Sequence, residues 1–136
     1  MTTDFLKWMT SVLCGIAGFL WGGLDGLLLA LIAFMVLDYI TGVIVGKIAN
    51  ELSSKTGFIG IAKKGFMLAV VSVGYILDTQ VFGNDGSVCR SAVIGFYLAN
   101  EGLSILENAG NLGMPLPDFL KKALKQLKNE SSMKKH

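Results

Sequence analysis

Apolar residues gather into four stretches along the chain, separated by short glycine-rich or charged segments. The stretches cover residues 8–21, 26–45, 65–77 (with an extension toward 82) and 91–109. An α-helix needs roughly twenty residues to cross a bilayer, and none of the stretches is an uninterrupted apolar run of that length. A helix satisfies its own backbone hydrogen bonds in lipid, whereas a closed barrel needs many alternating segments of about ten residues. The pattern therefore predicts an all-α integral membrane protein.

The composition also indicates a membrane protein. Hydrophobic residues make up 52% of the 136 positions and charged residues 16%, against about 25% charged in typical soluble domains. The mean hydropathy is +0.58. A chain of this length forms one compact unit. We predict a transmembrane domain over residues 1–114, with three to four spanning helices, and a cytoplasmic segment over residues 115–136.

The four stretches differ in how readily they insert. In residues 26–45 about a dozen Leu, Ile, Val and Phe residues contribute roughly −0.5 kcal/mol each, against about +3 kcal/mol for Asp38. That stretch inserts on its own. Residues 91–109 contain fewer apolar residues to offset the free-energy cost of inserting Glu101 into the membrane, and further polar residues add to that cost. The fourth stretch is therefore expected to need protein partners or water along one face.

Lysines indicate the orientation. They cluster in residues 47–64 and again in the last sixteen residues, and such clusters stay on the cytoplasmic side. The connection over residues 78–90 is then outside and the C-terminus is cytoplasmic. A turn at Gly22–Asp25 favours four spans with the N-terminus inside. If the first stretch lies in the membrane interface instead, three spans remain and the N-terminus is outside.

The C-terminal segment has the pattern of a basic amphipathic helix. Pro117 suits its first turn and Asp118 suits the positive end of its dipole. One face carries Leu116, Leu120, Ala123, Leu124 and Leu127, and the rest carries Lys121, Lys122, Lys125 and Lys128. Such a helix suits an anionic inner leaflet, and a solvated tail that only fixes topology is the alternative. Residues 129–136 are predicted to be a disordered tail.

Glycine is abundant, with 17 residues, and several are spaced four apart. This spacing lets helix backbones approach closely in lipid. The contacts are either between copies of the chain or within one chain. The candidate helix-packing residues are Gly18, Gly22, Gly26, Gly42 and Gly46.

Polar residues inside the apolar stretches are the strongest candidates for function. On the fourth stretch Asn100, Ser104, Glu107 and Asn111 recur at helical spacing. A polar stripe must face water or polar protein rather than lipid tails. It either lines a pore or a subunit contact, or is hydrogen-bonded within a monomeric bundle. The candidate pore-lining or oligomer-contact residues are Asp38, Thr41, Asn100, Glu101, Ser104, Glu107 and Asn108.

Other chemistries find little support in the sequence. The single histidine is His136, so a histidine metal site or a Ser-His-Asp triad is not expected. Cys14 and Cys89 both lie in or beside apolar runs, so two buried thiols are expected, with a disulfide as the alternative. No nucleophile or phosphate loop accompanies Glu101 and Glu107. The lysines also lack the interleaved aromatics of a nucleic-acid site. We predict no catalytic residue, metal, cofactor or nucleic-acid partner.

The run from Phe96 to Asn108 is a distinctive block, and Gly113–Pro117 follows it with the pattern Gly-x-Pro-x-Pro. Together with motifs earlier in the chain, these residues resemble the toxin-secretion/phage-lysis holin family, whose pattern closes with a similar Gly-x-Pro-x-Pro segment. The resemblance extends over about residues 25–125. The front half of the pattern is carried by Asp38–Gly42, Leu52–Gly57, Gly60 and Lys63–Gly65.

The resemblance implies a small phage-encoded or prophage-derived protein of the bacterial cytoplasmic membrane. Such proteins accumulate in the membrane and then oligomerise into lesions, through which an endolysin reaches the cell wall or a large toxin leaves. The implied partners are further copies of the chain, the lipid bilayer, the endolysin or toxin cargo and an antiholin. The alternatives are an antiholin, which regulates a holin, and a small ion or solute channel.

Overall fold

A computed structural model describes residues 1–85 and 87–133, and all of its regular elements are helices. The fold is therefore all-α, as predicted. The element bounds, in chain order, are α1 (Thr2–Trp21), α2 (Gly26–Ile48), α3 (Ser54–Ile76), the π-helical segment η1 (Leu77–Val81), α4 (Val88–Asn111) and α5 (Asp118–Met133).

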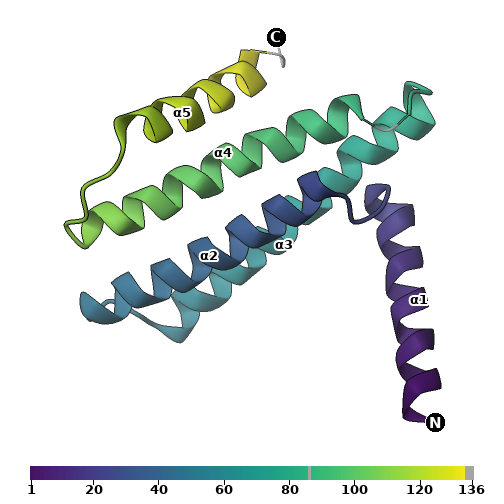
Figure 1. Cartoon of the computed structure of the whole chain (residues 1–136), viewed down its shortest axis with the longest axis horizontal. Helices are drawn as coiled ribbons and strands as arrows, with labels where there is room; N and C mark the ends of the chain where they lie inside the picture. Colours follow the sequence, from purple (N-terminus) through teal and green to yellow (C-terminus); the bar gives the residue numbers. More distant parts are fainter. Residues whose placement is uncertain (86, 134–136) are drawn as a thin grey trace.

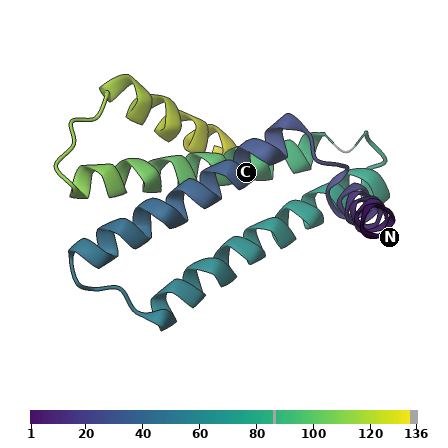
Figure 2. The same cartoon turned by 60° about the horizontal axis from the view of Figure 1, so that its bottom comes forward.

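Helices α2, α3 and α4 form an up-down-up bundle, in which α4 packs against both α2 and α3 (Figure 1). The π-helical segment η1 continues α3 directly. Helix α5 folds back along α4, and α1 projects away from the bundle in Figure 1 and is seen nearly end-on in Figure 2. The molecule is thus a three-helix bundle with one helix laid beside it and one helix standing apart.

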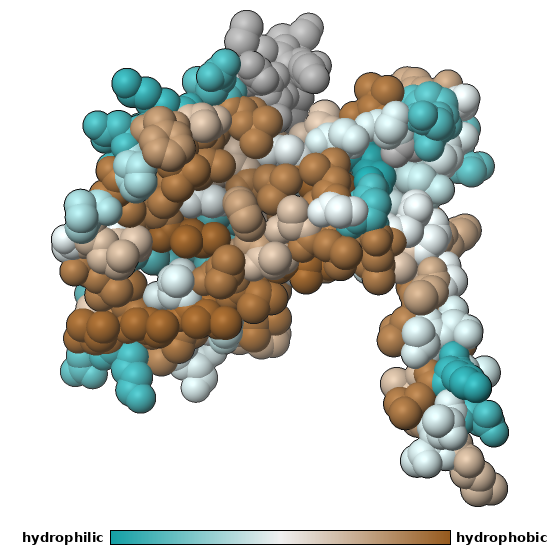
Figure 3. Space-filling model, in the orientation of Figure 1, coloured by the Kyte–Doolittle hydropathy of each residue, from teal (hydrophilic) through white to brown (hydrophobic). Residues whose placement is uncertain are grey.

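The buried core of the bundle is small. It consists of Leu28, Leu31 and Met35 from α2, Val71 from α3 and Ile94 from α4. Most other large apolar side chains point outward, and hydrophobic residues cover much of the visible bundle surface (Figure 3). Soluble monomers rarely expose apolar surface on this scale. The outward face of the bundle therefore suits lipid rather than water.

Two helical segments are long and apolar enough to cross a membrane. They are Gly26–Ile48 and Ser54–Val81, the latter joining α3 to η1. Helices α1 and α4 do not meet the same criterion of length and hydropathy. Of the three to four spans predicted, two are therefore supported by length and hydropathy, and any further span stays a prediction.

Helix boundaries differ from the apolar stretches in two places. Helix α3 begins at Ser54, well before the apolar run at residue 65, because the Ser53 hydroxyl accepts a hydrogen bond from the Thr56 amide at 3.1 Å and caps the helix. Lys55 and Lys64 therefore lie on a helix, and the cytoplasmic loop predicted over residues 47–64 is reduced to its first part. The predicted disorder after residue 128 is wrong as far as Met133, where α5 ends. Residues 134–136 lie outside the described residues.

The turn between α3 and α4 is organised by Asp78. Its carboxylate accepts the backbone amides of Cys89 at 2.8 Å and Arg90 at 2.9 Å, so it satisfies two amides in the first turn of α4. Asn84 donates a third hydrogen bond at 3.2 Å. Asp78 is fully buried, and these donors compensate for its loss of water. This residue therefore fixes the start of α4 against the end of α3.

Gly74 allows α3 and α4 to approach closely at this end. A Cβ at position 74 would lie 3.2 Å from the Cys89 carbonyl oxygen and 3.3 Å from the Arg90 amide nitrogen. Because these are backbone atoms, they cannot move aside without shifting the start of α4. We expect Gly74→Ala to destabilise the folded bundle by about 1–3 kcal/mol. The measurement is unfolding of the detergent-solubilised protein followed by circular dichroism.

Gly65→Ala is the matched control for this prediction. Gly65 lies on the same helix, and among the described atoms none would lie within 4 Å of its added Cβ. Alanine has the higher helix propensity, so this change is expected to be neutral or to stabilise by up to about 1 kcal/mol. Equal stability of the two variants would contradict the proposed close approach at Gly74.

Candidate functional site

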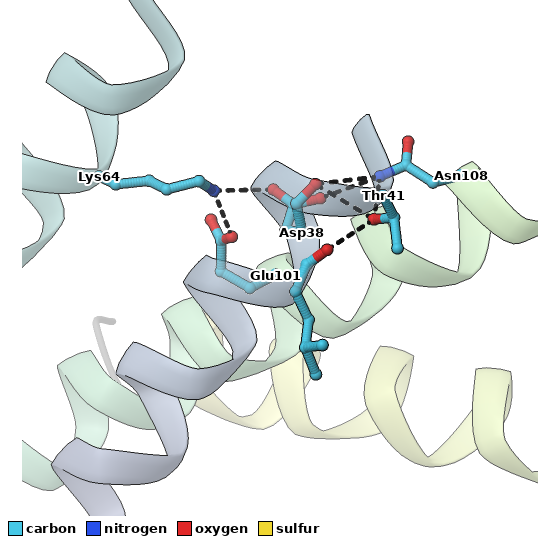
Figure 4. A network of polar contacts seen from close by, with 6 residues as sticks. Asp38, Thr41, Lys64, Glu101 and Asn108 are labelled. Atoms are coloured by element: carbon cyan, nitrogen blue, oxygen red, sulfur yellow. Dashed lines mark hydrogen bonds and ion pairs between the residues drawn. The ribbon is translucent and has the colours of Figure 1, made fainter. Parts of the chain in front are cut away.

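The centre of the bundle holds a lysine between two carboxylates from different helices. The ammonium of Lys64 on α3 lies 2.8 Å from Asp38 Oδ2 on α2 and 2.6 Å from Glu101 Oε2 on α4 (Figure 4). The three side chains are mostly buried: 16% of Lys64, 15% of Asp38 and 4% of Glu101 is exposed. One cation thus joins all three helices of the bundle.

A second set of hydrogen bonds extends this arrangement toward the end of the bundle near the α2–α3 loop. Asn108 Nδ2 on α4 donates to Thr41 Oγ1 at 2.8 Å and to Asp38 Oδ1 at 3.3 Å (Figure 4). The Thr41 hydroxyl donates to the Leu37 carbonyl oxygen at 2.8 Å. We call Asp38, Thr41, Lys64, Glu101 and Asn108 the polar cluster.

The polar cluster explains how apolar helices can carry charged residues. An isolated ion in a membrane interior is costly, and pairing with an opposite charge and hydrogen bonding reduce the cost. With all three charged groups ionised, the cluster carries two negative charges and one positive charge. Lys64 is therefore required to keep two carboxylates close together, and removing it leaves them facing one another.

A hollow of about 400 Å³ lies beside the polar cluster, between α2, α3 and α4. Besides cluster residues, its walls include Ser104, Tyr39 and the α3 glycines Gly57 and Gly60. A Cβ on Gly57 would lie 3.4 Å from the Tyr39 hydroxyl oxygen, so the absence of a side chain leaves room there. The hollow is large enough for several water molecules, and its polar wall can hydrogen-bond to them.

The structure divides the predicted polar stripe between two sites. Glu101, Ser104 and Asn108 line the hollow together with Asp38 of α2. Thr41 of α2 accepts a hydrogen bond from Asn108 beside the hollow. Glu107 is exposed and lines a different hollow, between α4 and α5, with Lys121 and Lys125. Asn100 is half-buried, and the polar contacts of the cluster do not include it. Residues three and seven positions after Glu101 share its face, whereas Glu107 is rotated away.

The pairing of Lys64 with two carboxylates was not predicted, because Lys64 was assigned to the loop whose positive charges set the topology. One signal was available. Asp38 and Glu101 are two carboxylates predicted within membrane spans, and such residues pair with opposite charges. Lys64 immediately precedes the third apolar stretch, so it is a cation close enough in sequence to enter the same bundle.

The predicted helix-packing glycines have different surroundings. Added Cβ atoms would lie 3.7 Å from Asn108 Nδ2 at Gly42 and 3.6 Å from Leu52 at Gly46, so both pack within the chain. Gly22 has a positive φ of 79° and ends α1, while Gly26 begins α2. The Gly22–Gly26 pair therefore does not form one helix face. At Gly18 and Gly26 no described atom lies within 4 Å of an added Cβ.

Helix α5 contacts α4 through a leucine, and its lysines differ in exposure. Leu124 approaches Gly102, where an added Cβ would lie 3.0 Å from both Leu124 methyl carbons. Lys122 and Lys125 are exposed, whereas Lys121 and Lys128 are half-buried. In the isolated chain Leu124 thus meets α4, while Leu120, Ala123 and Leu127 of the predicted apolar face are exposed. Contact of the α5 lysines with a membrane surface stays a prediction. Among the described residues no cluster of histidine, cysteine or carboxylate side chains is suited to a metal ion.

Comparison with known proteins gives a family and several relatives. Residues 15–129 match the model of the bacteriophage holin family. An uncharacterised protein of Clostridium perfringens strain 13 is 44% identical over 115 residues, covering 85% of this chain and 84% of the relative. An uncharacterised 14.9 kDa protein of C. perfringens is 42% identical, covering 93% and 96%. One of Halalkalibacterium halodurans is 36% identical, covering 93% and 96%. No solved structure matches the chain.

Lys64→Met tests whether the lysine holds the bundle together. The substitution keeps most of the side-chain length but leaves Asp38 and Glu101 without their shared cation. Breaking a buried ion pair by removing one partner costs roughly 3–5 kcal/mol, so we expect a loss of stability of that order. Lys63→Met changes the exposed neighbouring lysine and is expected to have little effect. The measurement is unfolding in detergent, and equal stabilities would show that the ion pairs contribute little.

Proposed function

Because the chain belongs to the bacteriophage holin family, we propose that it is a holin of the bacterial cytoplasmic membrane. In this proposal monomers accumulate in the membrane, associate with one another and open a lesion. The lesion lets an endolysin, or a large toxin, pass from the cytoplasm to the side of the cell wall. The protein acts by changing its assembly, without an enzymatic step or a cofactor.

The bridge from Lys64 to Asp38 and Glu101 is the observation that carries the proposal. It turns the most polar of the three bundle helices, α4, toward a cation on α3 and away from lipid. With its carboxylate paired in this way, α4 can cross the membrane as the third member of the bundle. The outer surface of α2 and α3 is meanwhile apolar, so a monomer is compatible with an intact bilayer.

Separation of the bundle helices would convert the same residues into a lesion lining. In the monomer the residues of the polar cluster bind one another. Their donors and acceptors are equally able to bind water or a neighbouring copy. The hollow beside the cluster gives water a place from which to enter. Because parting a buried ion pair costs several kcal/mol, opening is expected to be rare in single chains and favoured when many copies share one wet interior.

The lysines that flank the α2–α3 loop and those of α5 set the proposed orientation. In the proposed topology α2 runs inward, α3 outward and α4 inward, which places the α2–α3 loop and the α4–α5 turn on the cytoplasmic side. Because α5 folds back along α4 as far as Gly102, its exposed lysines, such as Lys122 and Lys125, reach the anionic inner leaflet when α5 leaves α4. The opposite end of the bundle, where α3 passes to α4, lies outside.

Induced expression beside a cytoplasmic endolysin that lacks an export signal tests the proposal. Culture turbidity and membrane potential are followed together, with and without the endolysin. We expect a delay and then an abrupt loss of both, with the fall in turbidity requiring the endolysin. A gradual loss of potential without lysis would instead indicate a small ion or solute channel. No change in either signal would indicate an antiholin, which needs a holin partner.

Glu101→Gln is expected to delay lysis in the same assay. Glutamine still accepts a hydrogen bond from Lys64, while the repulsion between the two carboxylates disappears and the polar cluster becomes neutral. The closed bundle is therefore more stable in lipid. Glu51→Gln changes an exposed carboxylate in the loop and serves as the control. Equal lysis times for the two variants, at equal protein levels, would remove the cluster from the opening step.

A further inference from the structure

Helix α1 stands apart from the bundle and meets it at one end only. Figure 1 shows it projecting sideways from the end where α2 begins and α3 passes into η1, and Figure 2 shows it nearly end-on at the same end. Ala17, near its C-terminus, is its one buried residue. The Tyr75 ring lies against the turn that follows, 2.7 Å from a Cβ placed on Gly22. Nearly the whole length of α1 is thus without a partner in the chain.

The two sides of α1 differ sharply. At 100° per residue, apolar side chains occupy about half of its circumference without interruption, and polar or small residues occupy the other half. The polar half includes Asp4, Lys7, Ser11, Cys14 and Gly18. The exposed apolar side chains are Phe5, Leu6, Trp8, Met9, Val12, Leu13, Ile16 and Phe19.

The apolar half of α1 faces the side on which the bundle lies. In Figure 3 hydrophobic atoms of α1 gather on the side toward the bundle, and the hydrophilic atoms near its free end lie on the opposite side. A bilayer that surrounds the apolar bundle would occupy this same side. The apolar half is therefore directed toward lipid and the polar half toward water.

The direction of α1 is fixed by an arginine. Arg90 on α4 donates to the carbonyl oxygens of Trp21 and Gly23, and its guanidinium contacts both oxygens of the Asp25 carboxylate at 2.8 and 2.9 Å. These hydrogen bonds hold the pKa of Asp25 below its usual range. The turn itself needs glycine, since Gly23 has a φ of 115°. Arg90 thus locks the junction between α1 and α2.

We propose that α1 lies in the membrane–water interface on the outer face of the cytoplasmic membrane, steeply inclined to the spanning bundle. Lipid is the partner of its apolar half. A half-apolar helix rich in large aromatic and aliphatic residues has the form of an interfacial helix. A spanning position would expose Asp4, Lys7 and Ser11 to lipid, because α1 does not pack along the bundle. The chain then has three spans, α2, α3 and α4, with its N-terminus outside.

This inference rests on the proposed function only for the identity of the membrane and the direction of the bundle. The end of the bundle that carries α1 is opposite the α2–α3 loop, which is flanked by Lys47 and Lys55. If that loop is cytoplasmic, α1 is outside. The turn at Gly22–Asp25 favoured four spans in the sequence, whereas the segregated faces and separate position of α1 support the alternative of three.

Cys14 is exposed, so the expectation that its thiol is buried is wrong. Because it lies near the middle of the polar half, Cys14 provides a native reporter. In a Cys89→Ser background, spheroplasts that retain their membrane potential are treated with a membrane-impermeant maleimide. The control variant, Cys14→Ser/Cys89→Ser/Ile16→Cys, moves the thiol to the middle of the apolar half. We expect Cys14 to react from outside, and the cysteine at position 16 to react severalfold more slowly.

Each other outcome would overturn the proposal. Labelling of Cys14 only in inverted vesicles would place the N-terminus inside and restore four spans. Protection of Cys14 from both sides would show a spanning or protein-covered helix, and a disulfide between chains at position 16 would show that a second copy covers the apolar half. Equal reaction at both positions would place α1 in water. Labelling does not require a lesion, so failure of lysis in the functional assay is a separate result.

Discussion

The contact of the Lys64 ammonium with the Asp38 and Glu101 carboxylates holds together helices that have little else to bind them. The core of the bundle is small, with five buried apolar residues in its main cluster, and most large apolar side chains point outward. In lipid such outward groups gain nothing from packing inward, since lipid tails are as apolar as leucine. Close packing and polar contacts must therefore hold the helices together, and Lys64 supplies a contact to both partners of α3.

The opposite end of the bundle uses charge differently. There Asp78 caps the start of α4, and Arg90 joins α4 to the turn before α2. The polar cluster links the bundle helices near their middle, whereas Asp78 and Arg90 are buried where the α3–α4 turn and the α1–α2 turn meet the start of α4. The difference matters for the proposed function. In the proposed opening, the helices separate around the polar cluster while the α3–α4 turn and the direction of α1 are retained.

The isolated chain has several surfaces suited to assembly, and its own helices cover only some of them. Helix α5 already uses Leu124 to cover Gly102 on α4, so one flank of α4 is occupied within the chain. The outer sides of α2 and α3 stay apolar and open to lipid or to further copies. In the holin proposal, chains with this surface are first dispersed in the membrane, and their helices rearrange when the chains assemble. That sequence of states is the one that the holin proposal requires.

Much of the architecture was determined by the sequence itself. Hydropathy alone identified a helical membrane protein, because backbone hydrogen bonding in lipid leaves few other structures. The run from Asp38 to Gly42 and the block from Phe96 to Asn108 were sufficient to indicate the family. The polar positions Asp38, Thr41, Glu101 and Asn108 were also identified, because polar groups in apolar stretches require a partner.

Only the tertiary structure decided which partner each polar group has. Periodicity places residues on a helix face but does not give the rotation of that face relative to other helices. Lys64 was therefore missed, and Glu107 was grouped with residues from which the structure separates it. The position of α1 is likewise a tertiary property, because it follows from the contacts of Arg90 with a turn 65 to 69 residues away in sequence. Local pattern fixes helices and their apolar sides, while long-range charge pairing fixes how they are arranged.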